Sequence, residues 1–339
     1  MISRLFGRVA AAVALALATI APAHANDGNT LEAQFDSTFG TETRAPRDFT
    51  ATYATPFEQQ LAQLANGARG RIGIAAVDLA TGQEIAVFGD QRFPMASTSK
   101  IAIAATYLEG VEQGRWTLSS EFALRVPVGS RRFSTAIAPT RDGQVMSAAQ
   151  LIDLMITRSS NPATDALLKA VGGPAAVNDW ARRAGISEFN LTRDIATLVR
   201  DDGEFDPAVH VDLRDSATPR AMAQLVSGIY QGKWLSPASR AVIVSAMERC
   251  VTGKGRIRAL LPGEVTVAHK TGTLSNTASD IGVLTTPDGR SLAVAIYVTG
   301  QGGKAGRDAK IASIARALYD GYYTDAGRQY ASARYPTAQ

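Results

Sequence analysis

The sequence predicts an α/β protein with an antiparallel five-stranded sheet built from both chain ends, flanked by helices, with an inserted all-helical lobe. Two strand patterns lie before residue 90, and three more lie after residue 264. Between about residues 100 and 250 the apolar residues recur at helical spacing, and cap residues and prolines mark the helix starts. Because strands at both ends enclose this helical block, we expect one sheet with a lobe inserted between its two parts.

The first 25 residues have the three parts of a secretory signal peptide. Arg4 and Arg8 form a basic start, residues 9–20 are apolar, and Ala23-His24-Ala25 is a small-residue cleavage site. The apolar stretch is short for a helix that spans a bilayer. We therefore expect cleavage after Ala25 and a periplasmic or secreted protein, and an uncleaved N-terminal anchor is the alternative.

The mature chain begins with elements of the predicted sheet. Residues 26–55 are polar and without periodicity, which predicts a flexible leader, and one globular domain is expected over residues 56–325. Its first elements are a helix over residues 57–64 and strands over residues 71–77 and 84–88. Ala80-Thr81-Gly82 forms the hairpin turn between these strands.

The helical lobe is expected over about residues 100–250. Ser147 caps a helix that runs through Ile156, and Gly172-Gly173 ends the next helix. Four prolines stand where first helical residues would be, three of them behind a cap residue: Pro162 behind Asn161, Pro174, Pro219 behind Thr218, and Pro237 behind Ser236.

The remaining strands are expected over residues 265–268, 279–285 and 291–298, with Pro287-Asp288-Gly289 as the last turn. A closing helix is expected over residues 305–319, and residues 326–339 are expected to be a tail. Together with the two early strands, these elements complete the predicted sheet.

Composition and charge exclude several classes of protein. The formal net charge is +4, and the two arginines of the signal peptide supply half of it, so no concentrated basic face for nucleic acid is indicated. Cys250 is the only cysteine, which excludes a disulfide within the chain. After the signal peptide only His210 and His269 remain, so we expect no zinc site and no cofactor. We also expect no membrane span after signal removal, and a monomer.

Ser97-Thr98-Ser99-Lys100 places a serine and a lysine one helical turn apart, at the head of an apolar helix. A serine hydroxyl becomes a nucleophile when a base lies within hydrogen-bond reach. A lysine in an apolar pocket loses part of its preference for the charged state, so it can supply that base. Alone, the tetrapeptide is more typical of a helix start at the surface.

Two further motifs follow along the chain. Arg158-Ser159-Ser160-Asn161-Pro162 supplies a serine and an asparagine in a short loop between helices. His269-Lys270-Thr271-Gly272-Thr273 closes the strand that begins near Val265, and it combines a cation, a hydroxyl and exposed backbone N–H groups. That combination suits an anionic substrate and an oxyanion. Alone, the first is more typical of a helix cap and the second of a polar strand end.

In this order, S-x-x-K, S-x-N and K-T-G are the signature set of class A β-lactamases and penicillin-binding proteins. From about Phe57 to Tyr322 the sequence resembles the class A serine β-lactamases. Three shorter stretches add to the resemblance: residues 94–98 around the serine, residues 215–219 at the end of the Ω-loop, and residues 252–257 ahead of K-T-G.

The resemblance implies a role for each residue of the three motifs. Ser97 would attack the lactam carbonyl, and the backbone N–H groups of Ser97 and Thr273 would form the oxyanion hole. Lys100 would be the base or part of a relay to it, since the identity of the base is disputed for the family. Ser159 would pass a proton to the departing lactam nitrogen.

The other motif residues would bind the substrate. Lys270 would assist the proton transfer and attract the substrate carboxylate, and Thr271 in the K-T-G strand with Gly272 would bind that carboxylate. Asn161 would orient Lys100 and the side-chain amide of the substrate. Arg256 would make a further carboxylate contact, and a surface arginine is the alternative.

One part of the family pattern is missing. Class A enzymes hydrolyse the acyl-enzyme with a glutamate in an E-x-x-L-N loop motif, and the stretch between Thr192 and Asp215 lacks it. Spacing back from Asp215 favours Asp202 first and Glu204 second as the carboxylate that positions the water. The alternative is that both are solvated loop charges.

The sequence thus predicts a serine hydrolase that opens β-lactam amides through an acyl-enzyme on Ser97, as an antibiotic-resistance enzyme with a small-molecule substrate. The missing motif favours an alternative, a penicillin-binding D,D-peptidase-like hydrolase with slow deacylation. A non-catalytic binding module with the same fold is the third hypothesis, and the presence of every acylation group counts against it.

Overall fold

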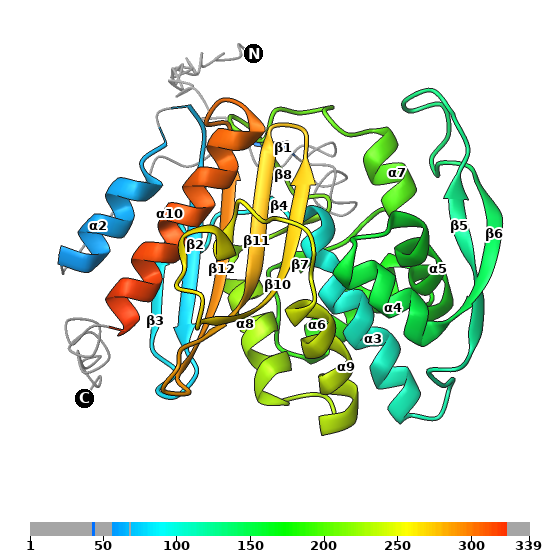
Figure 1. Cartoon of the computed structure of the whole chain (residues 1–339). Helices are drawn as coiled ribbons and strands as arrows, with labels where there is room; N and C mark the ends of the chain where they lie inside the picture. The colour runs from blue at the N-terminus through cyan, green and yellow to red at the C-terminus, as the bar shows by residue number, and fades with distance from the viewer. Residues whose placement is uncertain (1–42, 45–55, 68, 324–339) are drawn as a thin grey trace, which may run out of the picture.

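The computed structural model describes residues 43–44, 56–67 and 69–323 (Figure 1). The predicted signal peptide and tail lie outside these residues, and so does the predicted leader apart from β1 (Thr43–Arg44), which pairs with β8 (Val211–Asp212). In the part of the chain that is described, no helix has both the length and the apolar character needed to cross a bilayer.

Both chain ends build one antiparallel sheet, as the sequence predicts. Its strand order is β10-β11-β12-β2-β3, so the two early strands continue directly from the three late ones. The bounds are Ile72–Asp78 for β2, Glu84–Val87 for β3, Thr266–Leu274 for β10, Thr277–Thr285 for β11 and Ser291–Thr299 for β12. β10 is therefore an edge strand, with one side free to face the lobe.

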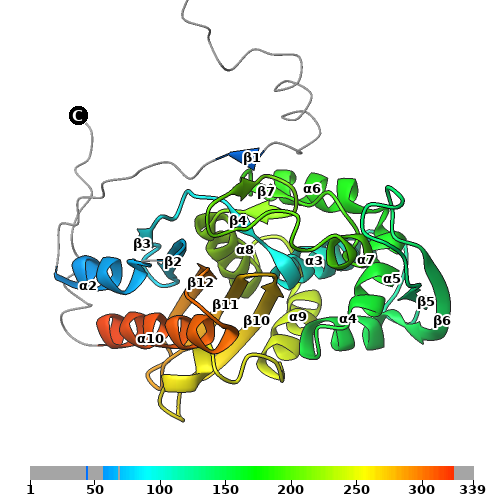
Figure 2. The same cartoon turned by 90° about the horizontal axis from the view of Figure 1, so that it is seen from above.

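The sheet is buried on both faces because successive side chains of a strand point to opposite sides. In β12, Val294 and Ile296 belong to the core under α2 (Pro56–Ala65) and α10 (Lys304–Tyr323). Their neighbours Ala295 and Tyr297 belong to the core that the sheet shares with α8 (Pro219–Gln231) and the lobe. Figure 2 shows this layering, with α10 and α2 on one side of the sheet and α8 on the other.

The inserted lobe is largely helical, and three of its helices, α4 (Ala148–Thr157), α8 and α9 (Pro237–Glu248), begin at the predicted cap residues. Ser147 forms a capping box with Gln150 at the start of α4, and Thr218 and Ser236 cap α8 and α9. Ser160, rather than Asn161, caps α5, which makes Asn161 the first helical residue. The helices of the lobe are α3 (Lys100–Glu112), α4 (Ala148–Thr157), α5 (Asn161–Val171), α6 (Pro174–Arg183), α7 (Ile195–Arg200), α8 and α9 (Pro237–Glu248).

The lobe also contains strands, which corrects the expectation that it is all helical. β5 (Glu121–Pro127) and β6 (Thr140–Ser147) form a hairpin at its outer edge (Figure 1), and β4 (Phe93–Pro94), β9 (Ser216–Ala217) and β7 (Phe189–Asn190) form a small sheet. Phe122, Leu124 and Val126 alternate with polar or small residues, which is the strand signal. The signal is weak because the hairpin buries little of either strand.

The third motif lies inside a strand rather than at its end. β10 runs to Leu274, six residues beyond the predicted end of the strand, so Lys270, Thr271, Gly272 and Thr273 are all paired with β11. The sequence did not predict this longer strand, because polar residues interrupt the apolar run that indicated the strand.

Candidate active site

Ser97 lies on a single turn of 3-10 helix, η1 (Ala96–Ser99), that leads directly into α3. Ala96, just before it, has a φ of +48°, a backbone conformation that residues other than glycine rarely adopt. The Thr98 hydroxyl donates to Met95 O (2.7 Å) and the Ser99 hydroxyl donates to Ala96 O (2.9 Å), which fixes the turn. None of the hydrogen bonds in the described part of the chain occupies the Ser97 hydroxyl, so it is available to react.

Ser159 holds its hydroxyl between two lysines. Its Oγ accepts from Lys100 Nζ at 3.2 Å and from Lys270 Nζ at 2.9 Å. The residue lies between α4 and α5 with a φ of +59°, again in the left-handed region. A strained conformation of this kind persists only where the surroundings enforce it, and such residues cluster at functional sites.

Lys100 is completely buried at the start of α3. Its Nζ donates to Asn161 Oδ1 and to the carbonyl oxygen of Ser159, both at 2.8 Å. Burial first, and the nearby charge of Lys270 second, hold the pKa of Lys100 well below its usual value. A lysine with a lowered pKa, one helical turn from Ser97, fits the base that the S-x-x-K spacing predicts.

Lys270 is also completely buried, on the edge strand β10. Its Nζ donates to Ser159 Oγ and to Thr271 O (2.8 Å). Burial lowers the pKa of Lys270 to about 8, so it keeps its proton at neutral pH. The two lysines share one hydroxyl partner, and burial lowers the pKa of both.

Gly272 lets the edge strand approach the nucleophile turn. A Cβ at this position would lie 2.8 Å from Met95 O and 3.1 Å from the Ala96 Cβ. Real Cβ atoms almost never come so near to a backbone oxygen, so only glycine allows this contact. The glycine of K-T-G thus brings Thr271 and Thr273 beside Ser97.

Arg256 is buried behind the edge strand, which excludes the alternative of a surface arginine. Its guanidinium donates to the carbonyl oxygens of Gly272 (2.8 Å) and Ser279 (2.9 Å), to Thr273 Oγ1 (2.6 Å) and to Asp308 Oδ1 (2.7 Å). These bonds fix the strand next to the site. A contact with the substrate carboxylate stays a prediction.

His269 points to the other face of β10, as the strand alternation predicts. Its Nδ1 lies 2.9 Å from Asp280 Oδ1, and both side chains are completely buried. Its neighbour Lys270 reaches Ser159 instead. The histidine is therefore separated from Ser97 by the strand, and it does not form a Ser-His-Asp arrangement.

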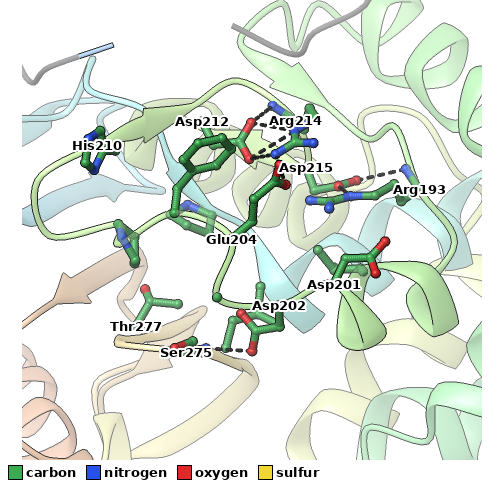
Figure 3. Close-up of a pocket in the computed structure, with 16 residues that line it drawn as sticks. Arg193, Asp201, Asp202, Glu204, His210, Asp212, Arg214, Asp215, Ser275 and Thr277 are labelled. Atoms are coloured by element: carbon green, nitrogen blue, oxygen red, sulfur yellow. Dashed lines mark hydrogen bonds and ion pairs between the residues drawn. The ribbon is translucent and has the colours of Figure 1, made fainter. Parts of the chain in front are cut away.

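The segment between Thr192 and Asp215 closes on itself as a loop. Arg193 Nε donates to Asp215 Oδ2 at 2.6 Å, and Asp215 Oδ1 also accepts from the backbone N–H groups of Thr192 and Arg193. The loop covers a pocket whose other wall is the turn after β10 (Figure 3). The groups that line this pocket do not include Ser97, Lys100, Ser159 or Lys270.

Asp202 and Glu204 lie in this pocket and have structural partners (Figure 3). Asp202 Oδ2 accepts from the backbone N–H of Ser275 at 2.8 Å, and Glu204 Oε2 accepts from Arg214 at 2.6 Å. The structure thus gives both carboxylates a role in holding the loop. Among the described residues, neither carboxylate forms a hydrogen bond with the hydroxyl of Ser97.

Sequence reasoning missed Asp165. It is a buried carboxylate on α5, and its oxygens accept from the backbone N–H groups of Ile195 and Ala196 in α7. The signal that points to it is helical spacing, since it follows Asn161 by four residues and shares its face of the helix.

Comparisons with known proteins agree with this geometry. The family model described as "Beta-lactamase enzyme family" matches residues 56–322. Beta-lactamase CTX-M-6 of Salmonella typhimurium is 33% identical over 247 residues, which is 73% of this chain and 82% of that protein. The extended-spectrum beta-lactamase PER-1 of Pseudomonas aeruginosa is 27% identical over 279 residues, covering 80% of this chain and 88% of that protein.

Solved structures give the same result. An ancestral class A beta-lactamase of Gram-negative bacteria has 36% sequence identity and a TM-score of 0.67, covering 78% of this chain and 99% of that one. A beta-lactamase from Chitinophaga pinensis has 27% identity and a TM-score of 0.69, with coverage of 78% and 99%. The chain belongs to the beta-lactamase enzyme family, as a member of its class A serine branch.

Proposed function

We propose that this chain opens the amide bond of β-lactams by forming an acyl-enzyme on Ser97. The observation that carries the proposal is the shared hydroxyl of Ser159, which connects Lys100, whose pKa lies well below its usual value, to Lys270, which is charged at neutral pH. This arrangement provides a base, a proton carrier and a cation around one nucleophile.

The part of the proton path that runs from Lys100 through Ser159 follows the hydrogen bonds of the site. Lys100 takes the proton of the Ser97 hydroxyl as Ser97 attacks the lactam carbonyl. Ser159 accepts from Lys100 and passes a proton to the departing lactam nitrogen, and the charge of Lys270 lowers the cost of this transfer. The C–N bond of the lactam breaks, and the acyl group remains as an ester on Ser97.

Binding and oxyanion stabilisation come from the edge strand β10. Lys270 attracts the substrate carboxylate and Thr271 donates to it, while the buried guanidinium of Arg256 adds positive charge behind the strand. The backbone N–H groups of Ser97 and Thr273 form the oxyanion hole, where each donor contributes about 3 kcal/mol to transition-state stabilisation. Asn161 orients Lys100 and the side-chain amide of the substrate.

A second candidate function is a penicillin-binding, D,D-peptidase-like hydrolase that deacylates slowly. The observation that favours it is the occupied state of Asp202 and Glu204, since both carboxylates hold the loop rather than a water at Ser97. Acylation needs only Ser97, Lys100, Ser159 and their neighbours, whereas turnover also needs a group that activates water. The two functions therefore differ only in the second half of the reaction.

Hydrolysis of a chromogenic cephalosporin, combined with intact mass spectrometry, separates these functions. A β-lactamase turns over many times and returns to its unmodified mass. A slow hydrolase gives one burst and a long-lived adduct, which peptide mapping places on Ser97. Ser97→Ala should abolish both signals, and Ser119→Ala, a change at an exposed serine before β5, should alter neither. Absence of an adduct and of turnover with every β-lactam would sink both functions.

We also propose that residues 1–25 direct the chain to the periplasm or outside the cell, and that residues 56–325 form the catalytic domain. The basic start, apolar stretch and Ala23-His24-Ala25 support the first statement. The span of the family match, residues 56–322, supports the second. N-terminal sequencing of the exported protein should begin at Asn26.

A further inference from the structure

Asp165 is a buried carboxylate on the helix face that meets the proposed base. Asn161, one turn earlier on α5, accepts from Lys100 Nζ at 2.8 Å. Residues four apart lie above one another on a helix, and α5 packs against α3, which carries Lys100. Only 5% of the surface of Asp165 is exposed. The carboxyl group is therefore enclosed by the lobe, on the face of α5 that carries Asn161, rather than facing solvent.

Both oxygens of Asp165 bind the first residues of α7. Oδ1 accepts from Ile195 N at 2.7 Å, and Oδ2 accepts from Ala196 N at 2.9 Å. No arginine or lysine forms an ion pair with this carboxylate among the described residues. Two backbone N–H groups are thus its direct partners, and its charge has to be balanced from further away.

A buried charge without an ion pair is costly, and the protein keeps one here. Burial raises the pKa of Asp165 to about 6, although the two backbone N–H groups and the charge of Lys100 oppose this rise. Groups kept in an unfavourable charge state are more frequent at functional sites than elsewhere.

The charged groups around Asp165 come from four elements. Lys100 of α3 acts on it as an opposite charge, and Asp194, the N-cap residue of α7, acts as a like charge. Arg125 of β5 and Lys169 of α5 line the cavity beside it. Lys169 is exposed and Arg125 is paired with another acid, so solvent and that acid weaken their effect. Lys100 is the cation on which the charge of Asp165 acts most strongly.

We propose that Asp165 is a positioning residue that couples the charge state of Lys100 to the attachment of α7. The proposal rests on the role of Lys100 in the proposed function. While it is ionised, Asp165 favours the proton on Lys100 and holds two N–H groups of α7. When it takes up a proton, one oxygen becomes a donor that faces an N–H donor, so one of the two bonds is lost.

The coupling extends the working range of the base toward acidic pH. As the pH falls through about 6, Asp165 becomes neutral and no longer favours the proton on Lys100. Lys100 then gives up its proton more readily than it would beside a permanent carboxylate. At the same pH, α7 and the loop after it are held less firmly.

A titration of the lysine side chains by NMR tests this coupling without any substrate. Lys100 is assigned by the loss of its signal in Lys100→Arg. In Asp165→Asn we expect the pKa of Lys100 to fall by about one unit, because an opposite charge has been removed. Asp165→Glu keeps the charge and should keep the wild-type pKa.

Asp194→Asn is the matched control, since it also removes a carboxylate that holds the start of α7, through Thr197 N at 2.8 Å. Hydrogen exchange of residues 194–200 should rise in both Asn variants, and the pKa of Lys100 should fall only in Asp165→Asn, because removal of the like charge of Asp194 keeps Asp165 ionised. An unchanged pKa in Asp165→Asn, or the same shift in both variants, overturns the proposal.

Acylation of Ser97 by a penicillin, followed by quenched mass spectrometry, gives the functional readout. The acylation rate is measured as a function of pH. The acid limb of this pH profile should move to lower pH in Asp165→Asn, and an acid limb that stays in place counts against the coupling. If the wild-type chain is not acylated at all, the proposed function fails, and the NMR titration still decides the role of Asp165.

Discussion

Two regions of this molecule treat their charged groups in opposite ways. At the nucleophile, Lys100 and Lys270 are completely buried and share the hydroxyl of Ser159, and no carboxylate contacts either ammonium group in the described part of the chain. In the pocket under the loop (Figure 3), the charges are paired. Glu204 and Asp212 both bind Arg214, and Asp215 binds Arg193.

The difference separates groups that react from groups that hold shape. An ion pair with several hydrogen bonds keeps its charge over a wide pH range, which suits the closure of a loop. A buried lysine without a carboxylate partner loses its proton more easily, so it can exchange protons during a reaction. Of the two carboxylates that the sequence favoured for catalysis, Glu204 is in such an ion pair and Asp202 binds a backbone N–H, whereas the two lysines have no carboxylate partner among the described residues.

The largest effect should come from removing the unpaired base. Lys100→Ala should slow acylation of Ser97 roughly a thousandfold, which is the usual contribution of general base catalysis. The change also removes a buried amine, so the fold should persist, as near-UV circular dichroism would show. Stopped-flow mixing with a chromogenic cephalosporin measures the acylation rate.

Lys169→Ala is the control for this change, because Lys169 is an exposed lysine on α5. It should acylate at the wild-type rate. If Lys100→Ala acylates within about tenfold of wild type, Lys100 is not the base, and the distinction between the two regions fails.

The second effect is a pH dependence that Lys270 sets. Its pKa of about 8 means that the ammonium charge is present below pH 8 and is lost as the pH rises. Attraction of the substrate carboxylate should therefore weaken above pH 8, and kcat/KM should fall by up to about tenfold per pH unit, mainly through KM. A pH profile of kcat/KM measures this limb.

Lys270→Arg sharpens the result, since a guanidinium stays charged throughout this range. The variant should therefore lose the alkaline limb of the pH profile. An activity below that of the wild type at every pH is compatible with this result, because a guanidinium has a different shape from an ammonium group. An alkaline limb that remains in place in Lys270→Arg would assign the titration to another group.

The sequence was sufficient for the parts of the site that local patterns encode. Ser97 and Lys100 are one helical turn apart, and Ser159 and Asn161 are two residues apart, so short motifs identify them. The sheet could also be predicted, because apolar strands at both chain ends have few other ways to be buried. The contact between these motifs then follows from the family pattern.

The parts that the sequence could not supply depend on contacts between distant segments. The structural role of Asp165 depends on its hydrogen bond with Ile195, thirty residues later. The role of Arg256 depends on its bonds to Asp308 and to a carbonyl oxygen of β10. No local pattern distinguishes Asp202, bound to a backbone N–H across the pocket, from a carboxylate that holds a water. Hydrogen bonds between residues that are far apart in the sequence decide these roles. The pattern within one segment gives no information on such bonds.

The smallest effect should come from the paired side of the comparison. Asp202→Asn and Glu204→Gln each weaken one partly exposed contact of the loop, and such contacts contribute about 0–1 kcal/mol. If these carboxylates only hold the loop, the deacylation rate should stay within about threefold of wild type. Mass spectrometry of the Ser97 adduct over time measures that rate, and an Asp288→Asn variant at the β11–β12 turn serves as the surface control.

A loss of about a hundredfold in the deacylation rate of either variant would instead make that carboxylate the water-activating group. In that case the loop would have to move during the reaction, because the bonds to Ser275 and Arg214 must open before a water at Ser97 can be reached.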